Sequence, residues 1–467
     1  MLQVRRLPLA RLGTLGAVCV GAWVYLASLP PGVARSGLNV LLITLDTTRA
    51  DHLGAYGFQS ISTPNIDRLA REGVLFEQST TAAPLTLPAH ASLFTGRFPP
   101  GHGIRDNVGF VLDPRETTMA EILARHGYRT GAFVGSVVLS SDRGLNQGFD
   151  TYRDDFSGSG ERTPADRGVL RRRASDVTDE ALSWIAGVRS SHFLAWLHFY
   201  DAHRPYDLPD PYASIYASRP YDGEIAYMDA QVGRVLAYLD ERRLLDSTVV
   251  IVIGDHGESL GDHGEAGHGI FVYESVTRVP FIIRAPFERL HGRIVADPTR
   301  SVDLLPTLMD LVGIRSPLPF DGTSLVPVMT GAVRSLNLEA YSESLYPLRA
   351  FGWSELHALR AGRFKVIAAP RPELYDLECD PFEEHNSFNE QRALAERMIA
   401  RLNELQRRSA ASAPFDRARV DGDAETAARL ASLGYISPSR GGYNGGATGA
   451  RPDPKDQIGF LDPRGHP

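Results

Sequence analysis

Thr86 is the first residue that could do chemistry, because its surroundings suit a nucleophile. It stands two residues before Pro88, and the pattern of residues 89–95 predicts a helix that Gly96 would end. Thr86 is therefore expected at or just before a helix N-terminus, where backbone N–H groups favour an anion. A hydroxyl in that place is a candidate nucleophile for a phosphate or sulfate ester. The alternative is that Thr86 only caps the helix.

Asp46, Asp255 and His256 are candidate metal ligands, since they follow two predicted buried strands. Residues 38–45 and 248–253 are short apolar runs rich in strand formers, which is typical of parallel strands in α/β proteins. Asp46 comes directly after the first run, and the other two residues lie on a glycine-flanked turn after the second. Ligand sites in such sheets collect at the carboxyl ends of strands. Asp46 could equally cap the next helix.

Two further histidines extend this set of polar residues. His203 follows Asp201 after a third apolar strand at residues 193–200, in a stretch that continues with proline and suits an active-site loop. His268 is the last of three histidines within 13 residues, a local enrichment that indicates a metal site. Asn107 lies 21 residues after the candidate nucleophile in a polar, glycine-flanked stretch.

The elements that must position these residues alternate along the chain. Strand-like runs are separated by amphipathic stretches that predict helices. After residue 330, four more strand-like runs and a helix predict a smaller C-terminal part. The predicted helices cover residues 63–73, 116–127, 174–188, 221–244, 301–313 and 391–407, and further strands are expected at 74–79, 130–134 and 278–283.

The composition excludes several classes of function. The chain has 467 residues, of which 49 are basic and 56 acidic, and a net charge of −7 gives no case for a nucleic-acid partner. Cys19 and Cys379 are the two cysteines. Because Cys19 lies in an N-terminal apolar run, we expect no intrachain disulfide, and a cysteine-based zinc site is excluded.

Residues 1–36 are predicted to be a signal peptide or a single N-terminal membrane anchor. Three arginines, Arg5, Arg6 and Arg11, precede residues 12–34, which contain no charged residue and are numerous enough to span a bilayer. Basic residues on the N-terminal side orient the rest of the chain outward. We therefore expect an extracytoplasmic protein, periplasmic or at the cell surface, that is either membrane-anchored or secreted.

The stretch from Thr86 to Arg97 resembles the sulfatase signature. That signature has Cys or Ser, one residue, Pro, one residue and Arg, then a small-Ser-Leu-Leu-Thr-Gly-Arg run, and its Cys or Ser is oxidised to the nucleophile formylglycine. Here Thr86 stands at the formylglycine position and His90 at the arginine position. Threonine cannot become formylglycine. At the nucleophile the chain is therefore more similar to the threonine-using phosphodiesterases and phosphoethanolamine transferases of the alkaline phosphatase superfamily, with His90 a candidate substrate-binding residue.

Other blocks of the chain resemble the same family. Residues 39–57 resemble the first sulfatase block, whose pair of aspartates binds the metal; Asp46 matches the first and Thr47 replaces the second. His203 matches a histidine that contacts the ester group. In related phosphonate and phosphodiester hydrolases, an asparagine at about the position of Asn107 contacts the substrate oxyanion, although a simple turn residue is an equal alternative.

The resemblance covers roughly residues 39–436 and implies the fold. It implies an α/β protein with a large, mixed, mostly parallel sheet flanked by helices and a small C-terminal α+β subdomain. The catalytic domain would occupy residues 37–330 and the C-terminal subdomain residues 331–410. Residues 411–467 would form a short helix and a disordered tail, because they are rich in glycine, proline and serine.

The resemblance also implies one divalent metal ion. Zinc or manganese suits a mixed set of carboxylate and imidazole ligands better than calcium, which takes oxygen ligands. The ion would lower the pKa of the nucleophilic hydroxyl, and attack would give a covalent phosphothreonine. The expected ligands are Asp46, the Thr86 hydroxyl, Asp255 and His256.

His203 and His268 would bind the non-bridging oxygens of the ester or protonate its leaving group. The 12-residue spacing from His256 to His268 resembles that of the phosphoethanolamine transferases. A two-metal arrangement, in which Asp201, His203 and His268 hold a second ion, is the less favoured alternative, because Asp201 and His203 are only two residues apart.

Three functions follow from these residues. The main prediction is a hydrolase or transferase that cleaves a phosphoric ester through Thr86, since water with metal help can attack a phosphothreonine at phosphorus. The first alternative is a sulfuric ester hydrolase without formylglycine. The second is a degenerate member that binds anions without turnover. In each case the expected partner is an anionic ester such as a lipid head group, a glycan or a small molecule.

Overall fold

The centre of the molecule is a nine-stranded sheet. A computed structural model describes residues 33–156, 171–316, 319–413 and 451–461. The strands are β1 (Asn39–Leu45), β2 (Val74–Thr80), β3 (Arg129–Phe133), β4 (Thr151–Arg153), β5 (Phe193–Phe199), β6 (Thr248–Gly254), β7 (Arg278–Arg284), β8 (Arg293–Val295) and β9 (Thr299–Arg300). Their order is β4-β3-β5-β1-β6-β7-β2-β8, with β9 beside β2. Because β7 alone runs antiparallel to its neighbours, the predicted mixed, mostly parallel sheet is confirmed.

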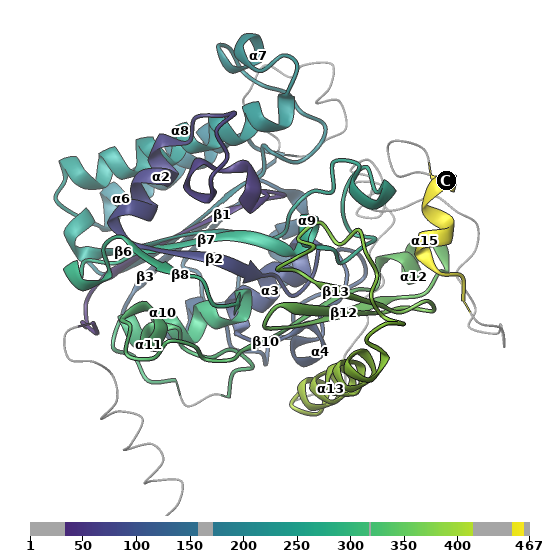
Figure 1. Cartoon of the computed structure of the whole chain (residues 1–467). Coiled ribbons are helices and arrows are strands. Elements are labelled where there is room, and N and C mark those ends of the chain that lie inside the picture. The colour runs from purple at the N-terminus through teal and green to yellow at the C-terminus, as the bar shows by residue number, and fades with distance from the viewer. Residues whose placement is uncertain (1–32, 157–170, 317–318, 414–450, 462–467) are drawn as a thin grey trace, which may run out of the picture.

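Helices cover both faces of this sheet (Figure 1). The alternation of side chains along β1 shows why: Val40 and Leu42 belong to one apolar core, whereas Leu41, Ile43 and Leu45 belong to the other. The second core lies under α2 (Pro64–Glu72), α6 (Ala174–Val188) and α8 (Pro220–Glu241). The first lies against α3 (Thr86–Thr95), α5 (Met119–Arg125), α10 (Leu304–Leu311) and α11 (Val326–Met329).

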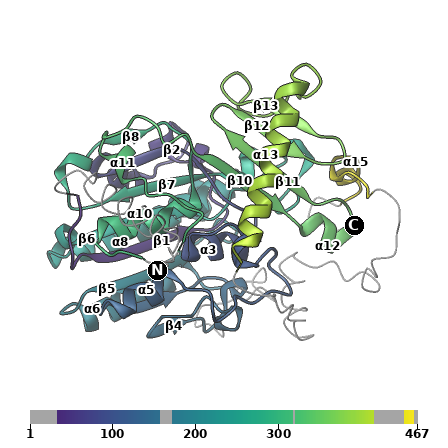
Figure 2. The same cartoon turned by 90° about the horizontal axis from the view of Figure 1, so that it is seen from below.

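A small antiparallel sheet follows in the C-terminal part of the chain, as predicted (Figure 2). One long helix packs on it through a separate apolar cluster. Its strands are β10 (Glu339–Ser344), β11 (Leu356–Ala361), β12 (Phe364–Ala368) and β13 (Glu373–Asp376), and the helix is α13 (Arg392–Ala411). Short helices are α4 (Pro99–His102), α7 (Tyr212–Ile215), α9 (Glu274–Thr277) and α12 (Tyr346–Phe351).

The two ends of the chain are described only in part. The sequence predicts a disordered tail, but residues 451–461 form α15 (Pro454–Gln457) and a 3-10 turn beside the small sheet, where Lys455 Nζ lies 3.1 Å from Glu373 Oε1. The short helix expected in the tail lies outside the described residues, as do residues 1–32 of the predicted N-terminal segment. Of the helices in the described ranges, none has the length and apolar character needed to cross a bilayer.

The register of the central strands brings the candidate residues to one edge of the sheet. Leu45, the last residue of β1, is paired with Phe199 on β5 and with Gly254 on β6. Since all three strands are parallel, the residues that follow them emerge at the same carboxyl edge. The fold therefore gathers Asp46 and Asp255 from strands far apart in the sequence.

Candidate active site

Three buried side chains form a cluster suited to a metal ion. Ligand atoms of Asp46, Asp255 and His256 all lie within 4.8 Å of one another. His256 Nε2 is 3.5 Å from Asp255 Oδ2 and 4.0 Å from Asp46 Oδ1. Neither of these two carboxylate oxygens has a hydrogen-bond partner within the described residues. Because buried carboxylate oxygens without partners are costly, the residues fit a bound cation.

The ring of His256 is oriented as a ligand. Its Nδ1–H donates to the Gly257 carbonyl at 3.0 Å, so that Nε2 carries the lone pair that faces the cluster. Histidines that bind metals commonly fix their other ring nitrogen in this way. Burial lowers the pKa of His256, but the carboxylates of Asp255 and Asp46 outweigh burial and raise it above its ordinary value.

His198 supports this cluster, although the sequence did not single it out. It lies inside β5, where its Nδ1 accepts the Gly135 N–H at 3.2 Å and its Nε2–H donates to Asp46 Oδ2 at 3.1 Å. Burial lowers the pKa of His198 to about 4, so the ring is neutral. His198 thus holds one oxygen of Asp46 and leaves Oδ1 for an ion. The only sequence signal was a histidine in an otherwise apolar strand.

Thr86 faces the cluster from the first turn of α3. Its Oγ1 lies 3.3 Å from His256 Nε2 and 3.5 Å from Asp46 Oδ2. The structure shows no capping bond from this hydroxyl within the described chain; Leu85 occupies the N-cap position. Gly96 ends the helix in the left-handed conformation, with φ of 65°. The predicted helix start therefore places the hydroxyl beside the candidate ligands.

Thr47 occupies the position where the family pattern has its second aspartate. Its backbone is held on both sides, because its N–H donates to Asp255 Oδ1 at 3.2 Å and its carbonyl accepts the Tyr221 hydroxyl at 2.7 Å. Thr47 has φ of 50°, a conformation that is unusual for a β-branched residue. The strained turn after β1 is therefore fixed by partners from two other elements.

Asn107 contacts the first turn of α3, which carries Thr86. Its Oδ1 accepts the Leu87 N–H at 2.8 Å, in the first turn of α3. Its Nδ2 is buried and has no partner among the described residues. A buried amide N–H without a partner could donate to an oxyanion, and the substrate-binding role of Asn107 stays a prediction.

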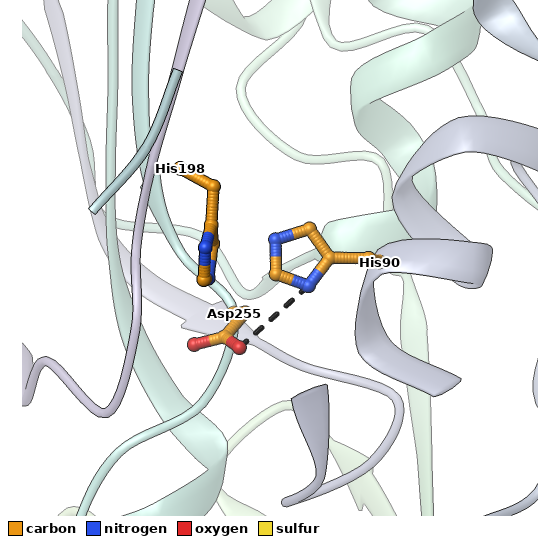
Figure 3. Close-up of side chains that lie close together, drawn as sticks. All are labelled: His90, His198 and Asp255. Atoms are coloured by element: carbon orange, nitrogen blue, oxygen red, sulfur yellow. Dashed lines mark ion pairs between the residues drawn. The ribbon is translucent and has the colours of Figure 1, made fainter. Parts of the chain in front are cut away.

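His90 is held by protein atoms at both ring nitrogens. Its Nδ1–H donates to the Thr86 carbonyl at 2.8 Å, and its Nε2 accepts the Thr44 hydroxyl at 3.0 Å. Burial lowers the pKa of His90 to about 3, so the ring is neutral. The 3.7 Å contact of Nδ1 with Asp255 Oδ2, dashed in Figure 3, therefore involves no imidazolium charge. Contact between His90 and a substrate stays a prediction.

His203 and His268 converge on the cluster from the loops after β5 and β6. The ring centroid of His268 lies 4.4 Å from that of His256 and 5.1 Å from that of His203. His203 also stacks on Tyr200 at 4.5 Å. His263, the third histidine of the local cluster, lies apart and stacks on Tyr273 at 3.6 Å.

Asp201 contacts the start of α6. Its two carboxylate oxygens accept the Ala174 N–H at 3.0 and 3.2 Å. The metal-ligand groupings found among the described residues do not include Asp201. The second metal set of Asp201, His203 and His268 remains a prediction.

Arg49 supports the turn that carries two of the candidate metal ligands, and sequence reasoning missed it. Its Nη1 donates to the Glu258 carbonyl at 3.2 Å and to Asp262 Oδ2 at 2.7 Å. Its Nε and Nη2 hold both oxygens of Asp51, at 2.9 and 2.8 Å. Glu258, which was also missed, is buried and has Oε2 3.4 Å from His268 Nδ1.

Comparison with known proteins identifies the family. Residues 38–314 match the family model described as Sulfatase, and residues 261–408 match that of the N-sulphoglucosamine sulphohydrolase C-terminal region. Mouse steryl-sulfatase is 30% identical over 496 residues, which cover 76% of this chain and 79% of that protein. The chain belongs to the sulfatase family, within the alkaline phosphatase superfamily, and is a sulfatase-family hydrolase.

Other relatives differ in the names they carry. The multifunctional alkaline phosphatase superfamily protein PehA of Trinickia caryophylli is 26% identical, over 74% of this chain and 90% of that protein. The crystal structure of phosphonate monoester hydrolase of Agrobacterium radiobacter superposes with a TM-score of 0.67 at 24% identity, covering 80% of this chain and 96% of that one. The latter likeness shows the shared fold.

Proposed function

We propose that this chain hydrolyses an anionic ester at a divalent metal site, with Thr86 Oγ1 as the nucleophile. The main support for this proposal is the position of the Thr86 hydroxyl, which lies 3.3 Å from His256 Nε2 and 3.5 Å from Asp46 Oδ2. Beside it, two buried carboxylate oxygens have no partner within the described chain. A degenerate binding protein would have no need to keep a nucleophile, ligands and donors in one place.

Sulfuric esters are the first candidate substrates. The family model and relatives such as steryl-sulfatase favour them over phosphoric esters, which reverses the order that the sequence predicted. Phosphoric or phosphonic esters are the second candidate. Thr86 favours them, because a threonine adduct has no second hydroxyl and must be cleared by attack at sulfur or phosphorus. The multifunctional relative supports keeping both classes.

The residues divide the work of the attack. A divalent ion held by Asp46, Thr86, Asp255 and His256, most consistent with zinc or manganese, would lower the pKa of the hydroxyl and offset the charge of the ester. Asn107 Nδ2 donates to a non-bridging oxygen of the ester. We assign His203 and His268 to proton transfer with the leaving group and the attacking water, because their rings lie next to each other and His268 lies beside His256.

The experiment compares ester classes on one preparation. Nitrophenyl sulfate, phosphate, phosphate diester and phosphonate are offered to metal-free protein supplied with Zn²⁺, Mn²⁺ or Ca²⁺, with Thr86→Val as the matched control. We expect turnover of at least one class that requires a metal and is lost in Thr86→Val. Equal turnover by the Thr86→Val variant would contradict the nucleophile, and no turnover of any ester would favour the binding protein.

We also propose that the catalytic domain acts outside the cytoplasm, since the arginine-flanked apolar segment at residues 12–34 supports export. A reporter fused after residue 60 tests this. Activity of the reporter in the cytoplasm alone would contradict the proposal.

A further inference from the structure

The loop at residues 255–271 contains two buried glutamates whose partners differ. Glu265 accepts hydrogen bonds from two backbone N–H groups and one hydroxyl of the loop, at 2.7, 3.2 and 3.2 Å. It therefore holds the loop together. Glu258 Oε2 instead lies 3.4 Å from His268 Nδ1, and its Oε1 has no hydrogen-bond partner among the described residues. The carboxylate of Glu258 therefore contacts His268 rather than the backbone of the loop.

His268 lies beside His256, which contacts the candidate nucleophile. Its ring centroid is 4.4 Å from that of His256, whose Nε2 is 3.3 Å from Thr86 Oγ1. The side chains of His268 and Glu258 are 6% and 1% exposed, so the pair is enclosed by protein. A proton that moves through His268 would thus move inside the enclosed site that also holds the buried Thr86.

The backbone of Glu258 is held firmly. Arg49 Nη1 donates to its carbonyl at 3.2 Å. A Cβ on the preceding Gly257 would lie 2.1 Å from the Ser275 carbonyl oxygen, so that turn packs directly against α9. A carboxylate on such a support can fix the rotation of an imidazole ring.

The proposed function leaves a chemical need that this pair can meet. An adduct on Thr86 has no geminal hydroxyl, so water must attack at sulfur or phosphorus and must lose a proton as it does so. An imidazole whose Nδ1–H faces a carboxylate exchanges protons with other groups through Nε2. Glu258 and His268 have this arrangement.

We propose that Glu258 is a positioning residue for His268, and that His268 is the base that clears the Thr86 adduct; this inference rests on the proposed function. Water gives a proton to His268 Nε2 while its oxygen forms a bond to sulfur or phosphorus. The bond from that atom to Thr86 Oγ1 breaks, and its electron pair stays on the threonine oxygen. The imidazolium then returns the proton to Thr86, which restores the enzyme.

The test separates formation of the adduct from its removal. Nitrophenyl ester of whichever class the wild type turns over is mixed rapidly with wild type, Glu258→Gln and Glu258→Ala, and the quenched protein is weighed by mass spectrometry. We expect Glu258→Ala to release the first nitrophenolate at the normal rate but to turn over at least about tenfold more slowly, with the adduct accumulating. Glu258→Gln should keep more activity, because its carbonyl oxygen can still accept the Nδ1–H.

Glu265→Gln is the matched control, since it also changes a buried glutamate of the same loop. It should lower the thermal midpoint without accumulating the adduct. Metal content of all variants is measured, so that a lost ion is not taken for a lost base. The Gln variant keeps the test valid if Glu258→Ala does not fold.

The outcomes distinguish the two proposals. The proposed roles of Glu258 and His268, the dyad, are overturned by either of two results. In the first, Glu258→Ala and Glu258→Gln turn over like wild type. In the second, release of the first nitrophenolate and later turnover slow equally, and no adduct accumulates. If turnover persists in a variant that lacks the Thr86 hydroxyl, the proposed function fails and the dyad with it. Accumulation of the adduct in Glu258→Ala but not in Glu265→Gln supports both.

Discussion

Two buried carboxylates dominate the electrostatics of the site. Burial raises the pKa of Asp46 to about 7. Burial also raises the pKa of Asp255, and the charge of Asp46 adds to that effect. Such shifts mean that the charged forms are destabilised without an ion. The same carboxylate oxygens that destabilise the metal-free protein therefore favour binding of a cation.

Asp255→Asn tests this balance. Asn keeps the Oδ1 that accepts the Thr47 and His256 N–H groups at 3.2 and 2.7 Å, and removes the unpartnered negative oxygen. In EDTA, we expect the variant to be more stable than wild type by about 1–3 kcal/mol. With Mn²⁺ at about 100 times its dissociation constant, wild type should gain roughly 2.7 kcal/mol, and the variant almost nothing. Urea unfolding in both buffers measures the free energy of unfolding. If Mn²⁺ stabilises the variant as much as wild type, Asp255 is not a metal ligand.

His198→Phe tests whether the carboxylate of Asp46 needs the hydrogen bond from His198. The substitution removes the Nε2–H that holds Asp46 Oδ2 at 3.1 Å, while a ring remains in β5. Metal affinity should fall about 10–100-fold, as for other residues that orient ligands. Calorimetric titration with Mn²⁺ gives the number, and unchanged affinity would show that Asp46 is held without His198.

At the scale of elements, the turn after β6 packs so closely against its neighbours that it has no room for a larger side chain at Gly257. A Cβ at Gly257 would lie 2.1 Å from the Ser275 carbonyl oxygen, whereas a Cβ at Gly187 in α6 would meet nothing within 4 Å among the described residues. The first glycine is therefore required by packing against α9. The second is a helix position where alanine is compatible.

The pair Gly257→Ala and Gly187→Ala tests that difference. Gly187→Ala should stabilise the protein by about 0.5 kcal/mol, because alanine costs less conformational entropy in a helix. Gly257→Ala should lower both stability and metal affinity, since the turn that carries Asp255 and His256 must shift. Denaturation and metal titration of both variants provide the check. A Gly257→Ala protein with normal metal affinity would mean that the turn is less rigid than its packing indicates.

Periodicity predicted the elements of the site well. Apolar runs indicated β1, β5 and β6, and residues at their ends are the ones that meet at the cluster. The predicted helix start at Thr86 was confirmed, because proline in the first turn of a helix and glycine after its end are local signals. His198, Glu258 and Arg49 could not be found this way. Their roles depend on partners 152, 10 and 213 residues away, and no local pattern encodes such contacts.

At the scale of the molecule, an ion pair joins the small sheet to the loop after α4. Arg105 follows α4 and contacts Glu343 on β10 through two hydrogen bonds, at 2.7 and 2.5 Å. Burial would raise the pKa of Glu343, but the Arg105 guanidinium outweighs it and holds that pKa below its ordinary value. Arg105 lies in the same loop as Asn107, so its contact with β10 connects the small sheet to that loop.

Glu343→Gln should destabilise the protein in a pH-dependent way. At pH 7 the cost is expected to be about 3 kcal/mol, because Arg105 loses its partner. A carboxyl with a lowered pKa in the folded state contributes stability that is present above its unfolded pKa and lost as pH falls. The difference between variant and wild type should therefore shrink below about pH 4. Urea unfolding at pH 7 and at about pH 3 checks this, with Asp376→Asn, which breaks an exposed pair with Arg363, as the control. A difference independent of pH would contradict the ionic role.

The overall architecture was also predicted correctly where the sequence carries block-wise patterns. The strand-like runs and the helix predicted after residue 330 correspond to β10 to β13 and α13. They could be predicted because each segment shows the hydrophobic periodicity of its own secondary structure. The docking of residues 451–461 was not predicted, since Lys455 and Asp453 hold this segment through contacts with Glu373 and Arg371 that composition does not reveal.

The most direct test of the account is the mass of the peptide that contains Thr86, taken from enzyme quenched with acid during turnover. We expect wild type to carry one sulfo or phospho group on Thr86. We expect Thr86→Val, which keeps the shape of the side chain and disturbs no capping bond, to carry none and to have lost turnover. A modified group on any other residue, or wild-type turnover by Thr86→Val, would contradict it.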